Sequence, residues 1–240
     1  MKKALQTLTA LSIAFGGYVL AKGITHGIAA AGTTPHEIVA AAFQEEPLRS
    51  TSTAMFVWFP AEVTEMRAAM VQMIDSGEIS AEALREAVQP FVGPVHALIA
   101  GVPDAGLVAL LDDQIALHAQ LAPEPLVCAQ MVVHGPSREV LTHPLMAGYD
   151  IESHYADYFS TLNRARYASP GAPATEADFD ALGAAMAGFS DESLTALENN
   201  RADDPALCGA VLALLQVVRD ADFPGAERVR RDFLVGMMSG

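Results

Sequence analysis

Apolar residues along this chain recur at the three- and four-residue spacing of helices over most of its length. Met66, Met70 and Met73, for example, fall on one face of a predicted helix, and such spacing lets an amphipathic helix bury one side. The one run rich in β-branched and aromatic residues, 47–59, has no second strand-like run to pair with, so we predict a helix there too. The pattern predicts an all-α fold, a bundle of antiparallel helical hairpins.

Capping residues, prolines and glycines predict where the helices begin and end. The sequence Thr34-Pro35-His36-Glu37 combines a capping box with a proline at the first helical position. Pro90 and Pro94 are expected to kink or break the helix that Ser80 caps. The predicted helices cover residues 35–43, 47–59, 61–75, 81–88 with a continuation to 100, 104–121, 125–133, 138–142, 151–167, 176–187, 191–198, 205–219 and 224–237.

The first 21 residues have the pattern of an export segment. Lys2 and Lys3 precede an uncharged, mostly apolar run from Ala4 to Ala21, the pattern of a signal peptide. Cleavage after Ala31 is a second possibility. The alternative is an uncleaved single-pass anchor, because a helix of that run spans about 27 Å against roughly 30 Å of hydrocarbon core. Both interpretations predict an exported chain, periplasmic or held by one N-terminal transmembrane helix.

Beyond this leader, a segment rich in proline, glycine and alanine divides the chain. This segment, residues 168–174, is the strongest linker candidate. The sequence therefore predicts a first helical part at 34–167 and a second at 175–240, packed on the first.

Charge narrows the classes of partner. The net charge is −15 and all three lysines lie in or beside the leader, while 51% of the 240 residues are hydrophobic. That apolar content predicts a folded core in spite of the charge. Nucleic acid is excluded as a partner because the chain has no basic stripe with which to neutralise phosphates. Membrane contact is expected only through the N-terminal segment, because anionic lipid repels an acidic surface.

Two stretches of the chain resemble each other. Residues 101–113 align without gaps with residues 188–200, and an acid-proline-x-x-cysteine sequence then follows in each copy, at 124–128 and 204–208. We interpret the similarity as a weak internal duplication of a helical hairpin. The alternative is that helices rich in alanine and leucine resemble each other by composition.

These two cysteines are the only ones in the chain. Because an exported protein usually pairs its cysteines, the sequence predicts a Cys128–Cys208 disulfide. Two buried thiols that pack as small apolar side chains are one alternative. A reactive thiol at a helix N-terminus is the other.

Catalytic and metal-binding patterns were sought and not found. The seven histidines show no spacing typical of zinc ligands, and no catalytic residue, metal or cofactor is predicted. His154 lies closest to an acid–base arrangement, because Asp150 and Asp157 flank it. A solvated, acidic helix start accounts for the same three residues.

Aromatic and methionine side chains at helical spacing form a candidate interaction surface, because methionine-rich faces adapt to partners. Ordinary core packing is the alternative. The residues of this surface are Phe56, Trp58, Met66, Met70, Met73, Tyr155, Tyr158 and Phe159.

The expected function is a non-catalytic, protein-binding or scaffolding role in the cell envelope, with another envelope protein as partner. A helical module that binds a small apolar ligand is the first alternative. A hydrolase or lyase that uses His154 with Asp150 or Asp157 is the second. The sequence leaves the partner and the oligomeric state open.

Overall fold

The computed structural model describes residues 34–44, 48–78 and 80–239, and in these ranges the chain forms twelve α-helices and two 3-10 helices without any strand. The predicted all-α class is therefore confirmed. The predicted export segment, residues 1–21, and the alternative cleavage site after Ala31 lie outside the described residues.

The helices follow one another with short connections. In chain order they are α3 (Pro35–Ala42), α4 (Leu48–Trp58), α5 (Pro60–Ser76), α6 (Ala81–Ala97), η2 (Leu98–Gly101), α7 (Asp104–Leu121), α8 (Pro125–His134), α9 (Arg138–Leu141), η3 (Pro144–Met146), α10 (Ile151–Arg164), α11 (Glu176–Ala185), α12 (Asp191–Asn199), α13 (Pro205–Asp220) and α14 (Ala226–Ser239).

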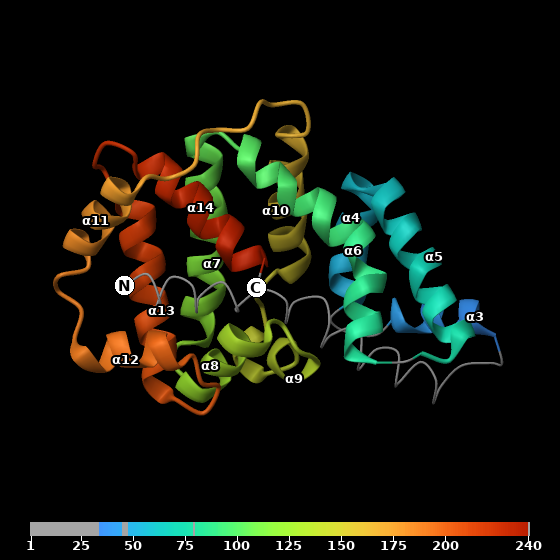
Figure 1. Cartoon of the computed structure of the whole chain (residues 1–240). Coiled ribbons are helices and arrows are strands. Elements are labelled where there is room, and N and C mark those ends of the chain that lie inside the picture. The colour runs from blue at the N-terminus through green and yellow to red at the C-terminus, as the bar shows by residue number, and fades with distance from the viewer. Residues whose placement is uncertain (1–33, 45–47, 79, 240) are drawn as a thin grey trace.

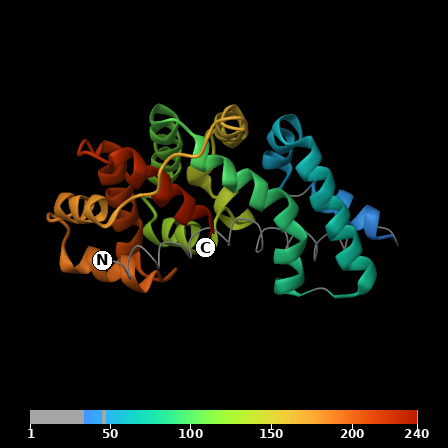
Figure 2. The same ribbon diagram turned by 45° about the horizontal axis from the view of Figure 1, so that its top comes forward.

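The molecule is elongated, with α3 to α5 at one end and α11 to α13 at the other (Figure 1). The helix α7 lies inside the larger end, where α8, α10, α13 and α14 all pack against it. Figure 2 shows α6 running from the small end toward these helices. Because α7 contacts helices from both sequence halves, it is the central element of the fold.

The helix starts follow from side-chain caps that the sequence predicted. Thr34 accepts a hydrogen bond from the backbone N–H of Glu37, and the Glu37 carboxylate accepts one in return, which completes a capping box. Thr175 forms the same arrangement with Asp178. Ser190 caps α12 through the N–H of Ser193. Each cap satisfies backbone donors that the helix itself leaves unpaired.

Pro90 and Pro94 were predicted to kink or break the helix, and the structure corrects the second of these outcomes, because α6 continues through both prolines as a single element. Figure 1 shows that α6 bends along its length. A proline removes one N–H and crowds the preceding turn, which bends a helix without ending it when the rest of the helix is packed. Here Phe91 and Val95 are buried between and beside the prolines.

Three phenylalanines join the two ends of the molecule. The rings of Phe59, Phe91 and Phe159 come from the start of α5, from α6 and from α10, and their centroids lie 5.8 to 6.0 Å apart with nearly perpendicular planes. Edge-to-face contacts of this kind add to the burial of the rings. The guanidinium of Arg166 lies 5.2 Å from the Phe59 ring centroid and pairs with Glu62 at 2.9 Å.

A buried arginine ties the second part of the chain to α7. Arg230 binds both carboxylate oxygens of Asp104 at 2.7 and 2.9 Å, and it donates to the carbonyl of Ala221 at 2.8 Å. Asp104 is the first residue of α7, and Ala221 follows the last residue of α13. One side chain therefore satisfies both an acidic helix start and a helix end, as the helix dipoles favour.

The predicted linker, residues 168–174, is not helical and lies along the folded helices. The N–H of Gly171 donates to the carbonyl of Ala100 at 2.7 Å, and the N–H of Ala174 donates to Asp232 at 2.9 Å. The guanidinium of Arg231 occupies the space that a side chain at Gly171 would need. These contacts fix the segment in place, while its role as a domain boundary stays a prediction.

Gly225 provides a test of how α14 is joined to α11. Its φ of +97° disfavours any other residue, and an added Cβ would overlap the Asp178 carboxylate, which binds Arg228 at 2.7 and 2.9 Å. We expect Gly225→Ala to lower the free energy of unfolding by about 2 kcal/mol or more. Gly209→Ala, in open space within α13, is the matched control and should raise it by about 0.5–1 kcal/mol. Equilibrium urea unfolding followed by circular dichroism measures the free energy of unfolding of both variants. An equal change in the two variants would contradict the requirement for glycine at position 225.

Candidate functional site

The two cysteines lie at bonding distance and join α8 to α13. Their sulfur atoms are 2.01 Å apart and their Cα atoms 5.5 Å apart, and the two residues are 80 positions apart in sequence. Each cysteine is the fourth residue of a helix that begins with proline, Pro125 in α8 and Pro205 in α13. The predicted pair is therefore formed in the structure, and no cysteine in the described residues is free.

A separate apolar cluster surrounds the bridge. Both cysteines are buried, and the thioether and aliphatic side chains around them come from α7, α8, α9 and η3. The cluster consists of Leu117, Leu121, Cys128, Met131, Val140, Met146 and Cys208. The connection between α8 and α10 is thus packed onto the bridge region by Val140 and Met146.

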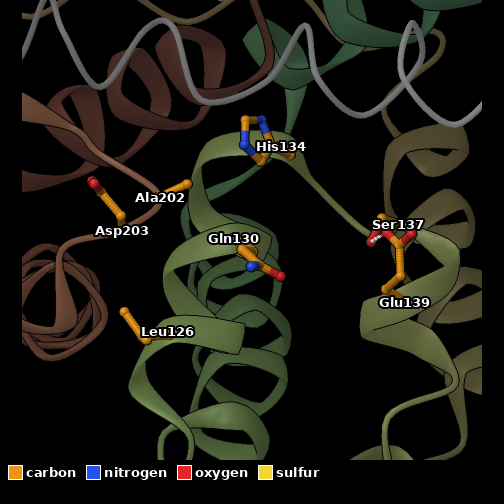
Figure 3. Close-up of a pocket in the computed structure, with 7 residues that line it drawn as sticks. All are labelled: Leu126, Gln130, His134, Ser137, Glu139, Ala202 and Asp203. Atoms are coloured by element: carbon orange, nitrogen blue, oxygen red, sulfur yellow. Dashed lines mark hydrogen bonds between the residues drawn. The ribbon is translucent and has the colours of Figure 1, made fainter.

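A pocket of about 510 Å³ opens on the outer face of α8 (Figure 3). Leu126, Gln130 and His134 lie along that face at four-residue spacing. Ser137 and Glu139 line it from one side, and Ala202 and Asp203 from the other, as Figure 3 shows. This pocket was not predicted from the sequence, although the four-residue spacing of Leu126, Gln130 and His134 already places these three residues on one face of a helix.

The pocket combines one exposed aliphatic side chain with several polar groups. Leu126 is 50% exposed. Asp203 is held by an exposed ion pair with Arg201 at 2.7 Å. An amide, an imidazole, a hydroxyl and two carboxylates therefore line the pocket beside this apolar side chain.

A second group of polar side chains is buried where α7 meets the start of α10. The hydroxyl of Tyr149 and Nδ1 of His154 share a hydrogen bond of 3.1 Å. His118 lies opposite on α7, and its Nδ1 donates to the carbonyl of Gln114 at 2.8 Å. Both histidines are buried. This group brings ionisable side chains of α7, of the connection before α10 and of α10 together around His154.

Burial lowers the pKa values of the two histidines and raises the pKa of a nearby carboxyl group. Burial and the neighbouring His118 lower the pKa of His154 to about 4, although Asp157 acts against that shift. Burial also lowers the pKa of His118. Burial and the nearby Asp157 and Asp112 raise the pKa of Asp113 to about 6. At neutral pH both histidines are therefore uncharged, because burial penalises the charged form.

Two tyrosines complete this group. Burial and the negative charge of Asp113 raise the pKa of Tyr149 to about 12, and the same two causes raise the pKa of Tyr158. Both hydroxyls therefore keep their protons at neutral pH. The group holds neutral donors and acceptors and one carboxyl that titrates near pH 6.

The acids that flank His154 in sequence have different roles in space. Asp150 caps α10, where its carboxylate accepts from the N–H and the hydroxyl of Ser153 at 3.0 and 2.8 Å. Those hydrogen bonds lower the pKa of Asp150. Asp157 is exposed one turn further along. The hydrogen-bond partner of His154 is Tyr149, which the sequence analysis did not single out.

Six of the eight residues of the predicted interaction surface lie in the core and are not available to a partner in this structure. Met66, Met70 and Met73 are buried on α5, and Tyr155, Tyr158 and Phe159 on α10. Their helical spacing therefore reflects core packing, the alternative that the sequence left open.

The two other residues of that predicted surface lie on α4. Phe56 is 36% exposed, and its ring centroid lies 6.1 Å from that of Phe43. The guanidinium of Arg67 lies 5.5 Å from the Phe56 ring centroid, and Trp58 is half-buried. Phe56 is therefore partly accessible to solvent and also forms a cation–π contact with Arg67.

Removal of the disulfide bridge should greatly lower the stability of the protein. We expect the double variant Cys128→Ala/Cys208→Ala to unfold with a free energy lower by roughly 3–5 kcal/mol, because the bridge closes a long loop in the unfolded chain. Equilibrium urea unfolding with and without reductant measures the effect. Reductant should lower the midpoint of the parent protein to that of the variant and leave the variant unchanged. A parent protein insensitive to complete reduction would contradict a stabilising bridge.

The described residues contain no further site that standard chemistry would identify. In residues 34–44, 48–78 and 80–239, no three histidine, cysteine or acidic side chains converge to hold a metal ion. In the same part of the chain, no helix is both long and apolar enough to cross a membrane. Comparison with protein-family models, with curated proteins and with solved structures found no match to this chain.

Proposed function

We propose that this chain is an exported helical protein, periplasmic or held at the membrane by its N-terminal segment, that binds or scaffolds another envelope protein without catalysis. The observation that carries the proposal is the bridge between Cys128 and Cys208. Disulfides persist in oxidising compartments and are rare in the cytosol, where reductants keep thiols free.

The pocket on α8 is the binding site that we propose for the partner. It lies on the helix that the bridge fixes to α13, so its floor is held by a covalent constraint. A site on a rigid element binds at a lower entropic cost than a site on a loop. Its exposed Leu126 provides an apolar side chain that a partner would remove from water.

Charge favours a basic group in the partner. Glu139 and Asp203 line opposite sides of the pocket, and the whole chain carries a net charge of −15. Arg201 already neutralises part of the charge of Asp203. An arginine or lysine beside an apolar side chain in the partner therefore matches this lining, and the long-range field of the acidic chain speeds such an encounter.

We also propose that the helices are organised as antiparallel hairpins, two of which arose by duplication. Helices start at aligned positions in the two similar stretches, at Asp104 and Asp191 and again at Pro125 and Pro205. The first helix of the second copy is shorter, with 9 residues in α12 against 18 in α7. The bridge then joins equivalent positions of the two copies.

A small apolar ligand is the second candidate for the pocket. It is favoured by the half-exposed Leu126, which lies in the same lining as Ala202. Trp58, on α4, is the chain's single tryptophan and lies outside that lining. Fluorescence of a Leu126→Trp/Trp58→Phe variant on addition of a fatty acid or an alkyl amine distinguishes this candidate from a protein partner.

Photocrosslinking tests the proposed site directly. A benzoylphenylalanine at position 126 should crosslink one envelope protein in stoichiometric amount, because Leu126 contacts the partner in this proposal. The same probe at Tyr167, which is 95% exposed beyond the other end of α10, is the matched control and should give none. Leu126→Glu should abolish co-purification of that protein while the far-ultraviolet spectrum stays unchanged. Equal crosslinking at both positions, or none at position 126, would count against this site.

A further inference from the structure

Several contacts attach the connection between α8 and α10, residues 135–150, to α7 and to α10. The side-chain amide of Gln120 donates to the carbonyl of Leu145. Val140 and Met146 are buried in the cluster around the bridge. At the end of the connection, the Tyr149 hydroxyl meets His154. The rest of this 135–150 segment forms only the four-residue α9 and the three-residue η3, so little regular structure holds it in place.

The histidines His118 and His154 lie at the base of this segment, one on each helix. Both are buried, and a charge on His118 would disfavour a charge on His154. His118 is also adjacent to the bridge, since the sulfur of Cys128 lies 3.8 Å from its carbonyl oxygen. A proton added to either ring would place a charge on a buried side chain that is neutral at pH 7.

We propose that the His118–His154 pair is an acid-sensitive latch, which holds the 135–150 segment against α7 at neutral pH and releases it on acidification. An exported protein meets the pH of its surroundings, and buried histidines convert that pH into a change of structure. The bridge keeps α8 and α13 together, so release is confined to the segment and the first turn of α10.

The charged surroundings of the pair support a local response. On α10 itself Asp157 faces His154, and Tyr149 approaches it from the segment. The helix α4, which packs along α10, carries only Arg49, and η2 carries no ionisable group. Asp113 on α7 faces Asp157 and the two tyrosines.

The other elements packed on α7 place their charges away from His118. The η3 helix has none, and α8 has only the exposed His134 at its last position. Arg219, beside Asp220, binds Asp112 at 2.7 Å. The charged residues of α14 are Glu227, Arg228, Arg230, Arg231 and Asp232, and Arg230 binds Asp104 at the opposite end of α7.

Linkage gives the direction and size of the effect. His154 has a pKa of about 4 in the closed state, and on release it regains an ordinary value near 6.5. Its protonation then favours release below about pH 6.5, and between pH 7.5 and 5.0 the opening equilibrium rises roughly 25-fold. His118 acts in the same direction. Asp113 opposes both, because its raised pKa makes protonation favour the closed state as the pH falls through about 6.

Hydrogen exchange on the oxidised protein at pH 7.5 and 5.0, expressed as protection factors, tests the latch. We expect several-fold lower protection of residues 135–150 at pH 5.0 and unchanged protection in α13. Asp113→Asn removes the carboxyl group that opposes release, so the loss of protection between pH 7.5 and 5.0 should grow to roughly 25-fold or more. His154→Gln should remove most of the dependence on pH. His36→Gln, at an exposed histidine of α3, is the matched control and should behave as the parent.

Tyr149→Phe provides a second variant in case His154→Gln fails to fold. It removes the 3.1 Å hydrogen bond and keeps both histidines, so basal opening should increase while the pH dependence stays. Protection of residues 135–150 that does not change with pH would overturn the latch, as would an equal loss throughout α13. No partner takes part in this experiment, so its result is independent of the proposed function. If the latch and the proposed binding site are both correct, release of residues 135–150 at acidic pH also moves Ser137 and Glu139 out of the pocket lining.

Discussion

A covalent bond between the first turns of α8 and α13 sets the geometry of the larger end of this molecule. It joins residues that are 80 positions apart, and the side chains around it come from four separate elements. Because both helices begin with proline, their starts are fixed in direction as well as in position. The pocket on α8, the packing of the 135–150 segment and the position of His118 all depend on this junction.

The remainder of the fold is held by a small number of arginines placed among many acids. Arg230, Arg228 and Arg219 bind Asp104, Asp178 and Asp112, and each pair joins helices that are distant in sequence. The chain has fourteen lysines and arginines and twenty-nine acidic residues. These three pairs therefore use part of a small number of positive charges to join helices. The remaining acids leave the chain with an excess of negative charge. Partly buried pairs with bidentate geometry also hold their partners in a defined orientation.

Burial is the largest cause of the pKa shifts in the group at the start of α10. His154 and Asp113 titrate in opposite directions from their ordinary values, because each prefers its neutral form away from water. Two uncharged histidines and two neutral tyrosines pack where charged groups would be unstable. The acid response that we propose for this junction follows from that burial.

The helices could largely be predicted from the sequence, because caps, prolines and glycines act within a single turn. The starts of α3, α11 and α12 follow from Thr34, Thr175 and Ser190 alone. The cysteine pair could also be predicted, since the chain offers only one pairing. The helix α6 was less accurately predicted, because local rules for proline do not include the tertiary packing of Phe91 and Val95.

The candidate sites were decided by the tertiary structure. Periodic aromatic and methionine positions look alike whether they face a core or a partner, and burial assigns Tyr155, Tyr158 and Phe159 to the core. His154 was identified from its acidic neighbours in sequence, yet packing pairs it with Tyr149 and brings it close to His118. The sequence by itself therefore determined the helices and the possible bridge, which depend on neighbouring residues and on composition. Only the folded structure decided the pocket and the histidine pair, because their residues meet through contacts between distant helices.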